Sequence, residues 1–247
     1  MAKGLNILKI LKMSHKHEFI KSEKTGYEVC VSCGTYHSVE QDSPEQIYEA
    51  EEYWCYDNKR SKFEEQILNL NETEGTGISK IDIVLKYVPA HTKDVLEGGC
   101  APGELLRQLT EGGYSAIGIE PSVRYIQPIL EHAPKSKVIH GYFPQVFDDE
   151  SNKELFDCLI FMDCFEHIDN TDLFIDTAYR LLRPGGALIC MSPIVMADGK
   201  KRDIDFIKRE HCWIYSQSFL DERLKEIFKE VKWDVWVNGH ELFAAYK

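Results

Sequence analysis

The chain has 247 residues, 43% of them hydrophobic and 28% charged, so it can bury a core and does not have the composition of a disordered protein. Its formal net charge of −12 argues against a nucleic acid partner, because phosphate binding needs a basic face. No apolar run approaches the roughly 20 residues that span a bilayer, and residues 1–12 lack the apolar block of a secretory signal. We therefore expect a protein without a membrane span, located in the cytoplasm.

Residues 1–43 are predicted to form an N-terminal segment with a zinc site. The candidate ligands are His17, Cys30, Cys33 and His37, with His15 as an alternative to His17. A Cys-x2-Cys turn followed by glycine presents two thiolates from one side, and tetrahedral zinc accepts two imidazole nitrogens as well. A redox Cys-x2-Cys pair normally follows a strand at the start of a helix, and the sequence lacks that context here. The pattern therefore favours structural zinc over a pair of ordinary loop thiols beside surface histidines.

Residues 44–77 are predicted as a helical cap and a linker. The stretch 44–52 has the character of a helix, and the glycine- and threonine-containing stretch 72–77 is typical of a linker or turn. From residue 78 onward, short apolar strand patterns alternate with helical patterns, which is the signature of a parallel sheet built from βαβ units. We assign residues 78–247 to one α/β domain.

The predicted elements of this domain follow one another in regular alternation. They are a helix over 78–88, strands over 94–97 and 115–120, a helix over 103–112, a helix opened by Pro121, strands over 137–140, 156–162 and 187–191, helices over 169–182 and 218–228, and a closing hairpin of 233–237 and 241–246. The run 156–162 is almost entirely apolar, as expected for a central strand that is buried on both faces. The Asn238-Gly239 pair is a strong hairpin turn signal.

The loop after the first strand is the most informative segment. It reads acid-x-Gly-x-Ala-x-Gly, with Glu97, Gly99, Ala101 and Gly103 at the defined positions. Small residues there let a ligand approach the backbone, and the following helix offers free N–H groups. The spacing does not match the G-x-G-x-x-G of dinucleotide-binding loops. A tight packing turn is the alternative for this loop taken alone.

This pattern resembles the first motif of class I S-adenosylmethionine-dependent methyltransferases, which usually have glycine where Ala101 stands. Three further segments resemble family motifs in the same order, namely 116–122, 156–168 and 181–188. The resemblance implies an α/β fold with a Rossmann-like, seven-stranded methyltransferase sheet, helices on both faces and an antiparallel last strand. A small N-terminal appendage, metal-binding or helical, would precede it.

The resemblance also implies the cofactor, S-adenosyl-L-methionine, and its contacts. The implied contacts are Glu97, Gly98, Gly99, Cys100, Ala101, Gly103, Glu120, Tyr142, Phe143 and Asp163. Glu120 ends the second strand, where a carboxylate accepts hydrogen bonds from both ribose hydroxyls. Many members place an aspartate after the third strand for the adenine amino group. Here Tyr142 or Phe143 follows that strand, and an aromatic ring suits the face of a purine.

Two histidines are candidates for removing a proton from the methyl acceptor. His167 follows Glu166 after the fourth strand, and His211 lies between the fifth strand and the next helix. A Glu-His pair after the fourth strand is often a structural, loop-fixing contact, which is the alternative for His167. Asp163, Glu166 and His167 also resemble the acid-x-x-Glu-His pattern of quinone O-methyltransferases, where a divalent cation is implied. Asp163 stands where those enzymes have glutamate, so we do not carry the cation over.

The function that these features imply is methyl transfer to a small molecule, at a hydroxyl of a sugar, a quinone-like compound or a secondary metabolite. One alternative is a protein methyltransferase. The other is a module that binds S-adenosylmethionine or S-adenosylhomocysteine without catalysis, which the departure at Ala101 and the missing third-strand acid favour slightly. The sequence does not indicate the oligomeric state.

Overall fold

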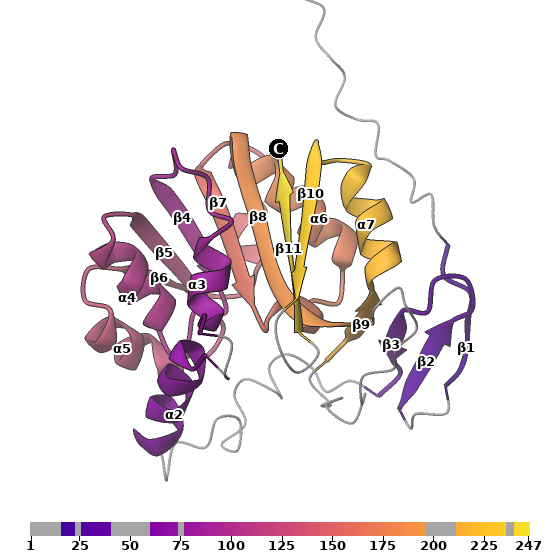
Figure 1. Cartoon of the computed structure of the whole chain (residues 1–247), viewed down its shortest axis with the longest axis horizontal. Coiled ribbons are helices and arrows are strands. Elements are labelled where there is room, and N and C mark those ends of the chain that lie inside the picture. The colour runs from indigo at the N-terminus through magenta and orange to yellow at the C-terminus, as the bar shows by residue number, and fades with distance from the viewer. Residues whose placement is uncertain (1–15, 23–25, 41–59, 74–76, 196–210, 236–239) are drawn as a thin grey trace, which may run out of the picture.

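The computed structural model describes residues 16–22, 26–40, 60–73, 77–195, 211–235 and 240–247 (Figure 1). Several expectations lie outside these residues. They concern residues 1–12, the alternative ligand His15, the helix over 44–52 and the Asn238-Gly239 turn. The predicted domain boundaries after residues 43 and 77 stay a prediction.

The central sheet has the architecture that the sequence predicts. Its strands are β4 (Asp94–Gly98), β5 (Ser115–Glu120), β6 (Lys137–His140), β7 (Phe156–Met162), β8 (Leu182–Val195), β10 (Glu230–Val235) and β11 (His240–Tyr246). Across the sheet they lie in the order β6-β5-β4-β7-β8-β11-β10. The pairs from β6 to β8 are parallel, and β11 is antiparallel to both β8 and β10. The expected seven-stranded methyltransferase sheet with an antiparallel last strand is confirmed.

Strand β7 shows why this sheet sits in the middle of the molecule. All seven of its residues are buried. Leu159 and Phe161 face one core cluster, whereas Cys158 and Ile160 face the other, as the period of two of a strand requires. A strand that is apolar on both faces must be covered on both faces, so the sequence of β7 alone demands two layers of helices.

Helices cover both faces, as expected (Figure 1). On one face lie α3 (Lys80–Leu85), α4 (Glu104–Glu111) and α5 (Val123–His132), and on the other lie α6 (Thr171–Leu181) and α7 (Gln217–Lys225). A further helix, α2 (Arg60–Asn71), precedes α3. No helix in the described part of the chain is both long and apolar enough to cross a membrane.

Several predicted boundaries differ from the structure, among them the starts of β8 and α5. Strand β8 begins at Leu182 and not at residue 187, because Gly185 N–H donates to the Lys247 carbonyl at 3.1 Å and Lys247 N–H donates to Gly186 at 2.9 Å. Because of these bonds, residues 183–186, between the predicted helix and the predicted strand, are part of β8. Helix α5 begins at Val123 behind Ser122 as its N-cap residue, so Pro121 lies outside the helix that it was expected to open.

The N-terminal segment contains short strands that the sequence pattern does not predict. Strands β1 (Phe19–Lys21), β2 (Tyr27–Cys30) and β3 (Tyr36–Ser38) form an antiparallel sheet of three. Strand β3 pairs with β9 (Trp213–Ser216), and β9 runs parallel to the end of β8. Figure 1 shows these strands, which we call the N-terminal sheet, beside β9 at the far end of the molecule from α4 and α5. The segment therefore extends the main sheet through β9.

Candidate active site

The candidate residues gather where the parallel strands end. Strands β4, β5, β7 and β8 run parallel, so their carboxyl ends lie at one edge of the sheet. The loops that leave this edge carry Gly98–Gly103, Glu120 and the segment from Asp163 to His167. Ligands of open α/β sheets bind at this kind of edge, where the strand order reverses.

The loop after β4 needs its glycines for close packing. A Cβ atom on Gly98 would lie 2.1 Å from the Phe161 ring, which is closer than real Cβ contacts allow. Gly103 is the N-cap residue of α4 with φ of 89°, a left-handed conformation that suits glycine. Cys100 is fully buried, and a Cβ on Gly118 would lie 2.4 Å from its sulfur. The side chain of Cys100 therefore points into the core, and only its backbone remains for a ligand.

Glu120 joins the two loops at the ends of β4 and β5. One of its carboxylate oxygens accepts the Ser122 N–H at 2.8 Å, and the other accepts the Ala101 N–H at 3.4 Å. The side chain is only 4% exposed, and burial raises the pKa of Glu120 to about 7 although both N–H groups oppose the shift. A carboxylate has about four acceptor positions, so Glu120 retains capacity for two hydroxyl donors. This is the arrangement expected for a ribose contact.

Glu97 lies beneath the same loop and supports it. The Leu106 N–H, in the first turn of α4, donates to its carboxyl group, and burial raises the pKa of Glu97 well above its usual value. Its Oε2 atom is buried and has no hydrogen-bond partner within the described residues. The structure thus places Glu97 as the group that holds the start of α4 against the end of β4.

The two residues expected to contact the adenine, Tyr142 and Phe143, have different environments in the structure. Phe143 is 7% exposed and packs edge-to-face on Phe161 at 4.8 Å and on Phe174 at 5.2 Å between ring centroids. Its expected role as a purine contact is corrected, because its ring is part of the apolar core. Tyr142, which is half-buried and precedes it, remains the candidate.

Asp163 directly follows β7 and contacts side chains of two other elements. Its carboxylate accepts the Lys80 ammonium from α3 at 2.8 Å and lies 3.3 Å from the His240 Nε2 at the start of β11. The positive charges of Lys80 and His240 hold the pKa of Asp163 below its ordinary value. Its backbone has φ of 49°, a strained conformation for a residue with a side chain. Such strain is often found at functional sites.

Glu166, His167 and His211 form a cluster at the same edge. Their ligating atoms all lie within 4.8 Å of one another, and the two imidazole centroids are 4.9 Å apart. The His211 Nε2 lies 3.9 Å from Glu166 Oε1. The other carboxylate oxygen of Glu166 accepts a hydrogen bond of 2.9 Å from the Ser192 hydroxyl. Glu166 is 1% exposed, and burial, reinforced by the charge of Asp163, raises its pKa to about 8. The cluster can therefore hold a proton near neutral pH.

The sequence predicted both histidines of this cluster but not Tyr27 and Ser192, which hold His211 and Glu166 in place. The Tyr27 hydroxyl of β2 donates to the His211 backbone carbonyl at 3.0 Å. Ser192 lies in β8, and neither residue belongs to a motif. No local signal marks them, because their role depends on contacts across long sequence separations. Asp163 is not part of the cluster, so the acid-x-x-Glu-His pattern does not converge as one set of ligands.

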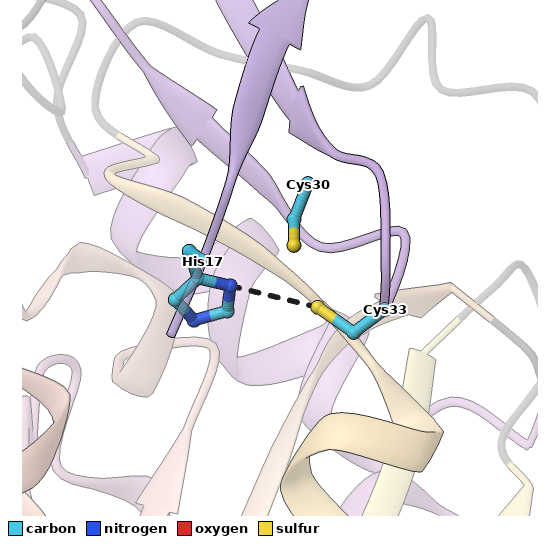
Figure 2. Close-up of side chains that lie close together, drawn as sticks. All are labelled: His17, Cys30 and Cys33. Carbon is cyan, nitrogen blue, oxygen red and sulfur yellow. Dashed lines mark hydrogen bonds between the residues drawn. The ribbon is translucent and has the colours of Figure 1, made fainter. Parts of the chain in front are cut away.

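The structure brings three of the four expected zinc ligands together, as Figure 2 shows. The ligating atoms of His17, Cys30 and Cys33 lie within 4.8 Å of one another. His37 is not in this group, which corrects the expected set of four. Its Nδ1 is 3.1 Å from Glu28 Oε1, and its ring lies 4.3 Å from the Trp213 ring between centroids. On an antiparallel sheet, residue 37 stands directly opposite residue 28, which explains the pairing.

Comparison with known proteins identifies the family. A profile of the family described as "Methyltransferase domain" matches residues 73–227, more than half of the chain. The chain belongs to this methyltransferase family. The ubiquinone biosynthesis O-methyltransferase of Nitrobacter winogradskyi is 32% identical to this methyltransferase domain over 94 residues, covering 38% of the chain and 36% of that protein. The mitochondrial enzyme of the same name from Rattus norvegicus is 30% identical over 113 residues, covering 40% and 30%. The chain thus spans about a third of the length of these curated relatives.

Solved structures agree on the fold. An O-methyltransferase family protein from Burkholderia thailandensis gives a TM-score of 0.60 at 16% identity, covering 80% of this chain and 62% of that one. A SAM-dependent methyltransferase from Thermotoga maritima gives 0.58 at 17% identity, covering 78% and 97%. Phosphoethanolamine N-methyltransferase 2 of Haemonchus contortus, solved with S-adenosylhomocysteine, gives 0.60 at 16% identity, covering 80% and 58%. These likenesses establish the class I methyltransferase fold.

Proposed function

We propose that this chain is an S-adenosylmethionine-dependent methyltransferase that methylates a hydroxyl of a small molecule. The observation that carries the proposal is the meeting, at one edge of the sheet, of the buried Glu120 carboxylate and the Glu166–His167–His211 cluster. The Glu120 carboxylate can accept hydrogen bonds from ribose hydroxyls, and the Glu166–His167–His211 cluster can accept a proton. Membership of the methyltransferase family supports the same assignment.

The cofactor, when bound, supplies an activated methyl group on a sulfonium. The chain's own task is then to bind, orient and deprotonate. Glu120 would accept the ribose hydroxyls, and the loop that begins at Gly98 would lie against the nucleoside, because its small residues keep the backbone accessible. Tyr142 would lie against the adenine face. Holding acceptor and donor in line supplies several kcal/mol of the barrier reduction.

His211 would take the proton from the acceptor hydroxyl. The Tyr27 hydroxyl holds the His211 backbone carbonyl, and the imidazole Nε2 lies 3.9 Å from the Glu166 carboxyl. Positioned general bases of this kind contribute about 10²–10⁴-fold to a rate. His167, in edge contact with His211, would either share this proton or orient the ring that carries it.

The curated relatives are named for O-methylation in ubiquinone biosynthesis, which favours a quinone-like or catechol acceptor among the hydroxyl compounds to be tested. Sugars and phenolic secondary metabolites are the other two acceptor classes. The chain matches only about a third of each relative, so an experiment is needed to identify the acceptor.

The test has two stages with the full chain. Calorimetry measures the binding of S-adenosylmethionine and of S-adenosylhomocysteine, and a labelled-methyl assay then screens catechols, sugars, phenols and peptides. We expect binding of both nucleosides and transfer to a small hydroxyl compound. Transfer to peptides alone would instead make the chain a protein methyltransferase. Binding without transfer to any acceptor would favour a non-catalytic module, and no binding would overturn the proposal.

A further inference from the structure

We propose that His17, Cys30 and Cys33 are the protein ligands of a zinc ion that fastens the N-terminal sheet to the methyltransferase sheet. The three ligands come from two separate points of the chain, one before β1 and two at the end of β2 and in the turn that follows it. Two thiols and an imidazole that converge within 4.8 Å match the donor types that zinc prefers.

The distances fit a tetrahedral ion. The Nδ1 of His17 lies 3.5 Å from the Sγ of Cys33. Zinc–nitrogen bonds of about 2.0–2.1 Å and zinc–sulfur bonds of about 2.3 Å, at tetrahedral angles, place these two ligand atoms roughly 3.5 Å apart. The two atoms therefore already stand at the spacing of one edge of such a site. Figure 2 shows both sulfur atoms directed toward the space beside the His17 ring.

The turn that carries the two cysteines is built to present them together. The Gly34 N–H donates to the Cys30 carbonyl at 2.9 Å, and the Cys30 N–H donates to the Thr35 carbonyl at 2.9 Å. Gly34 adopts φ of 76°, a left-handed conformation that closes the turn and that other residues adopt only with strain. The tight Cys-x2-Cys-Gly turn thus directs both thiols to one side, as in structural zinc sites.

The histidine ligand is held in place by aromatic rings. The His17 ring stacks on Phe19 at 5.1 Å and lies 4.6 Å from the ring of Phe219, which belongs to α7. Because both neighbours are apolar, they fix the ring without competing for its nitrogens. Cys30 is 1% exposed, and Cys33 packs against the core cluster to which Phe219 of α7 belongs. The site is therefore preformed at the seam between the N-terminal sheet and the main domain.

No further histidine, cysteine or acidic side chain joins this cluster among the residues that the structure describes. The three side chains fill three of the four positions of a tetrahedral zinc ion. The strands of the N-terminal sheet are three to four residues long, too short to be stable as an isolated sheet. An ion that binds only the folded arrangement adds its binding energy to the stability of this sheet.

The position of the ion links it to the candidate active site, a consequence that rests on the proposed function. The Ser216 N–H donates to the Thr35 hydroxyl at 3.1 Å, so the loop after the cysteines is joined to the start of α7. Tyr27, in the strand that ends at Cys30, holds the backbone of His211. Loss of the ion would loosen this contact. It would then lower the turnover number while leaving cofactor affinity intact.

The experiment uses the full chain and three measurements of metal binding. Elemental analysis should find one zinc per chain after gel filtration. Replacement of zinc by cobalt should give the absorption bands of a tetrahedral ion with thiolate charge transfer, and X-ray absorption should show at least two sulfur neighbours and at least one nitrogen neighbour. These measurements need no variant. Cys30→Ser, Cys33→Ser and His17→Asn should each lower zinc content at least tenfold, with folding checked by circular dichroism.

His37→Gln is the matched control. It removes the histidine that the sequence spacing alone would include and that pairs with Glu28 in the structure, so its zinc content should equal that of the wild type. Loss of zinc from this variant would overturn the assignment of the ligands. A folded wild-type chain that takes up neither zinc nor cobalt, or a Cys30–Cys33 disulfide found in freshly prepared protein, would overturn the site itself.

A chelator separates this proposal from the proposed function. Removing zinc from the wild type should lower turnover severalfold without changing the affinity for S-adenosylhomocysteine, and added zinc should restore it. A bound ion whose removal leaves turnover unchanged would overturn the link to His211 but keep the site. Failure to bind S-adenosylhomocysteine in the zinc-loaded chain would overturn the proposed function while the metal site stands.

Discussion

The Tyr27 hydroxyl donates a hydrogen bond of 3.0 Å to the backbone carbonyl of His211, a residue 184 positions further along the chain. This bond connects the N-terminal sheet to the cluster that contains Glu166 and His167. The N-terminal sheet is therefore a structural support of the candidate active site. In the described structure it adds no residue to the Glu166–His167–His211 cluster.

Removing this hydroxyl is expected to lower turnover modestly. Tyr27→Phe deletes one neutral hydrogen bond, which is worth about 0.5–1.5 kcal/mol, so kcat should fall by about two- to tenfold. The Kd for S-adenosylhomocysteine should not change, because the Tyr27 hydroxyl acts on the segment that carries His211. The matched control is Tyr36→Phe, on the neighbouring strand β3, which should leave kcat unchanged. Equal losses in both variants would show a general effect of the N-terminal sheet.

Replacement of His211 tests the proposed base. His211→Asn should lower kcat by about 10²–10⁴-fold and leave cofactor affinity within about twofold, since general bases contribute rates of that order. His91→Asn is the control, because His91 is exposed and lies near Gly185, before β4 and away from the carboxyl ends of the strands. Steady-state kinetics and calorimetry on the same preparations separate turnover from binding. Unchanged turnover in His211→Asn would remove this residue from the mechanism.

Glu120 is expected to carry much of the affinity for the nucleoside. Glu120→Gln keeps the shape of the side chain but replaces charge-assisted acceptors by weaker ones. Hydrogen bonds to charged groups are worth about 1.5–3 kcal/mol, so the Kd for S-adenosylhomocysteine should rise by about 10- to 100-fold. Glu131→Gln, an exposed change in the following helix, should have no effect. An unaltered Kd in Glu120→Gln would contradict the ribose contact.

The pKa of Glu120 also predicts a pH dependence of binding. Burial raises this pKa to about 7, so the free carboxyl is mainly neutral below that pH and mainly ionised above it. Ribose hydroxyls donate to the ionised form, so affinity should increase as the pH rises through 7. The Kd at pH 6 should be up to about tenfold weaker than at pH 8, because each unit below the pKa leaves tenfold less ionised carboxylate. Glu120→Gln should flatten this profile, and an equal slope in that variant would assign the dependence to another group.

Gly98 is expected to be intolerant of any side chain. A Cβ there would meet the Phe161 ring at 2.1 Å, so Gly98→Ala should destabilise the fold by about 1–3 kcal/mol or more through overpacking. Phe161→Leu shortens the opposing side chain and should recover part of this loss in the double variant. The measurement is a double-mutant cycle by urea unfolding. Strictly additive losses would show that the two residues do not oppose each other.

The alternation of apolar patterns was sufficient to predict the central sheet. β5, β6 and β7 begin and end at the predicted residues, because each is a short apolar run bounded by turns or by a helix start. Such runs must be buried wherever the rest of the chain lies, so local composition decides them. The order of the motifs was also sufficient to identify the family.

The roles of single side chains depended on distant partners. Phe143 and Tyr142 are adjacent and both aromatic, yet packing on Phe161 and Phe174 commits the first to the core. His37 has suitable zinc spacing, yet Glu28 on the opposing strand takes its ring nitrogen. The contact of Tyr27 with His211 has no local signature at all. Burial preference is a property of each segment, whereas a side chain's partner is set by which segments the tertiary fold brings opposite it.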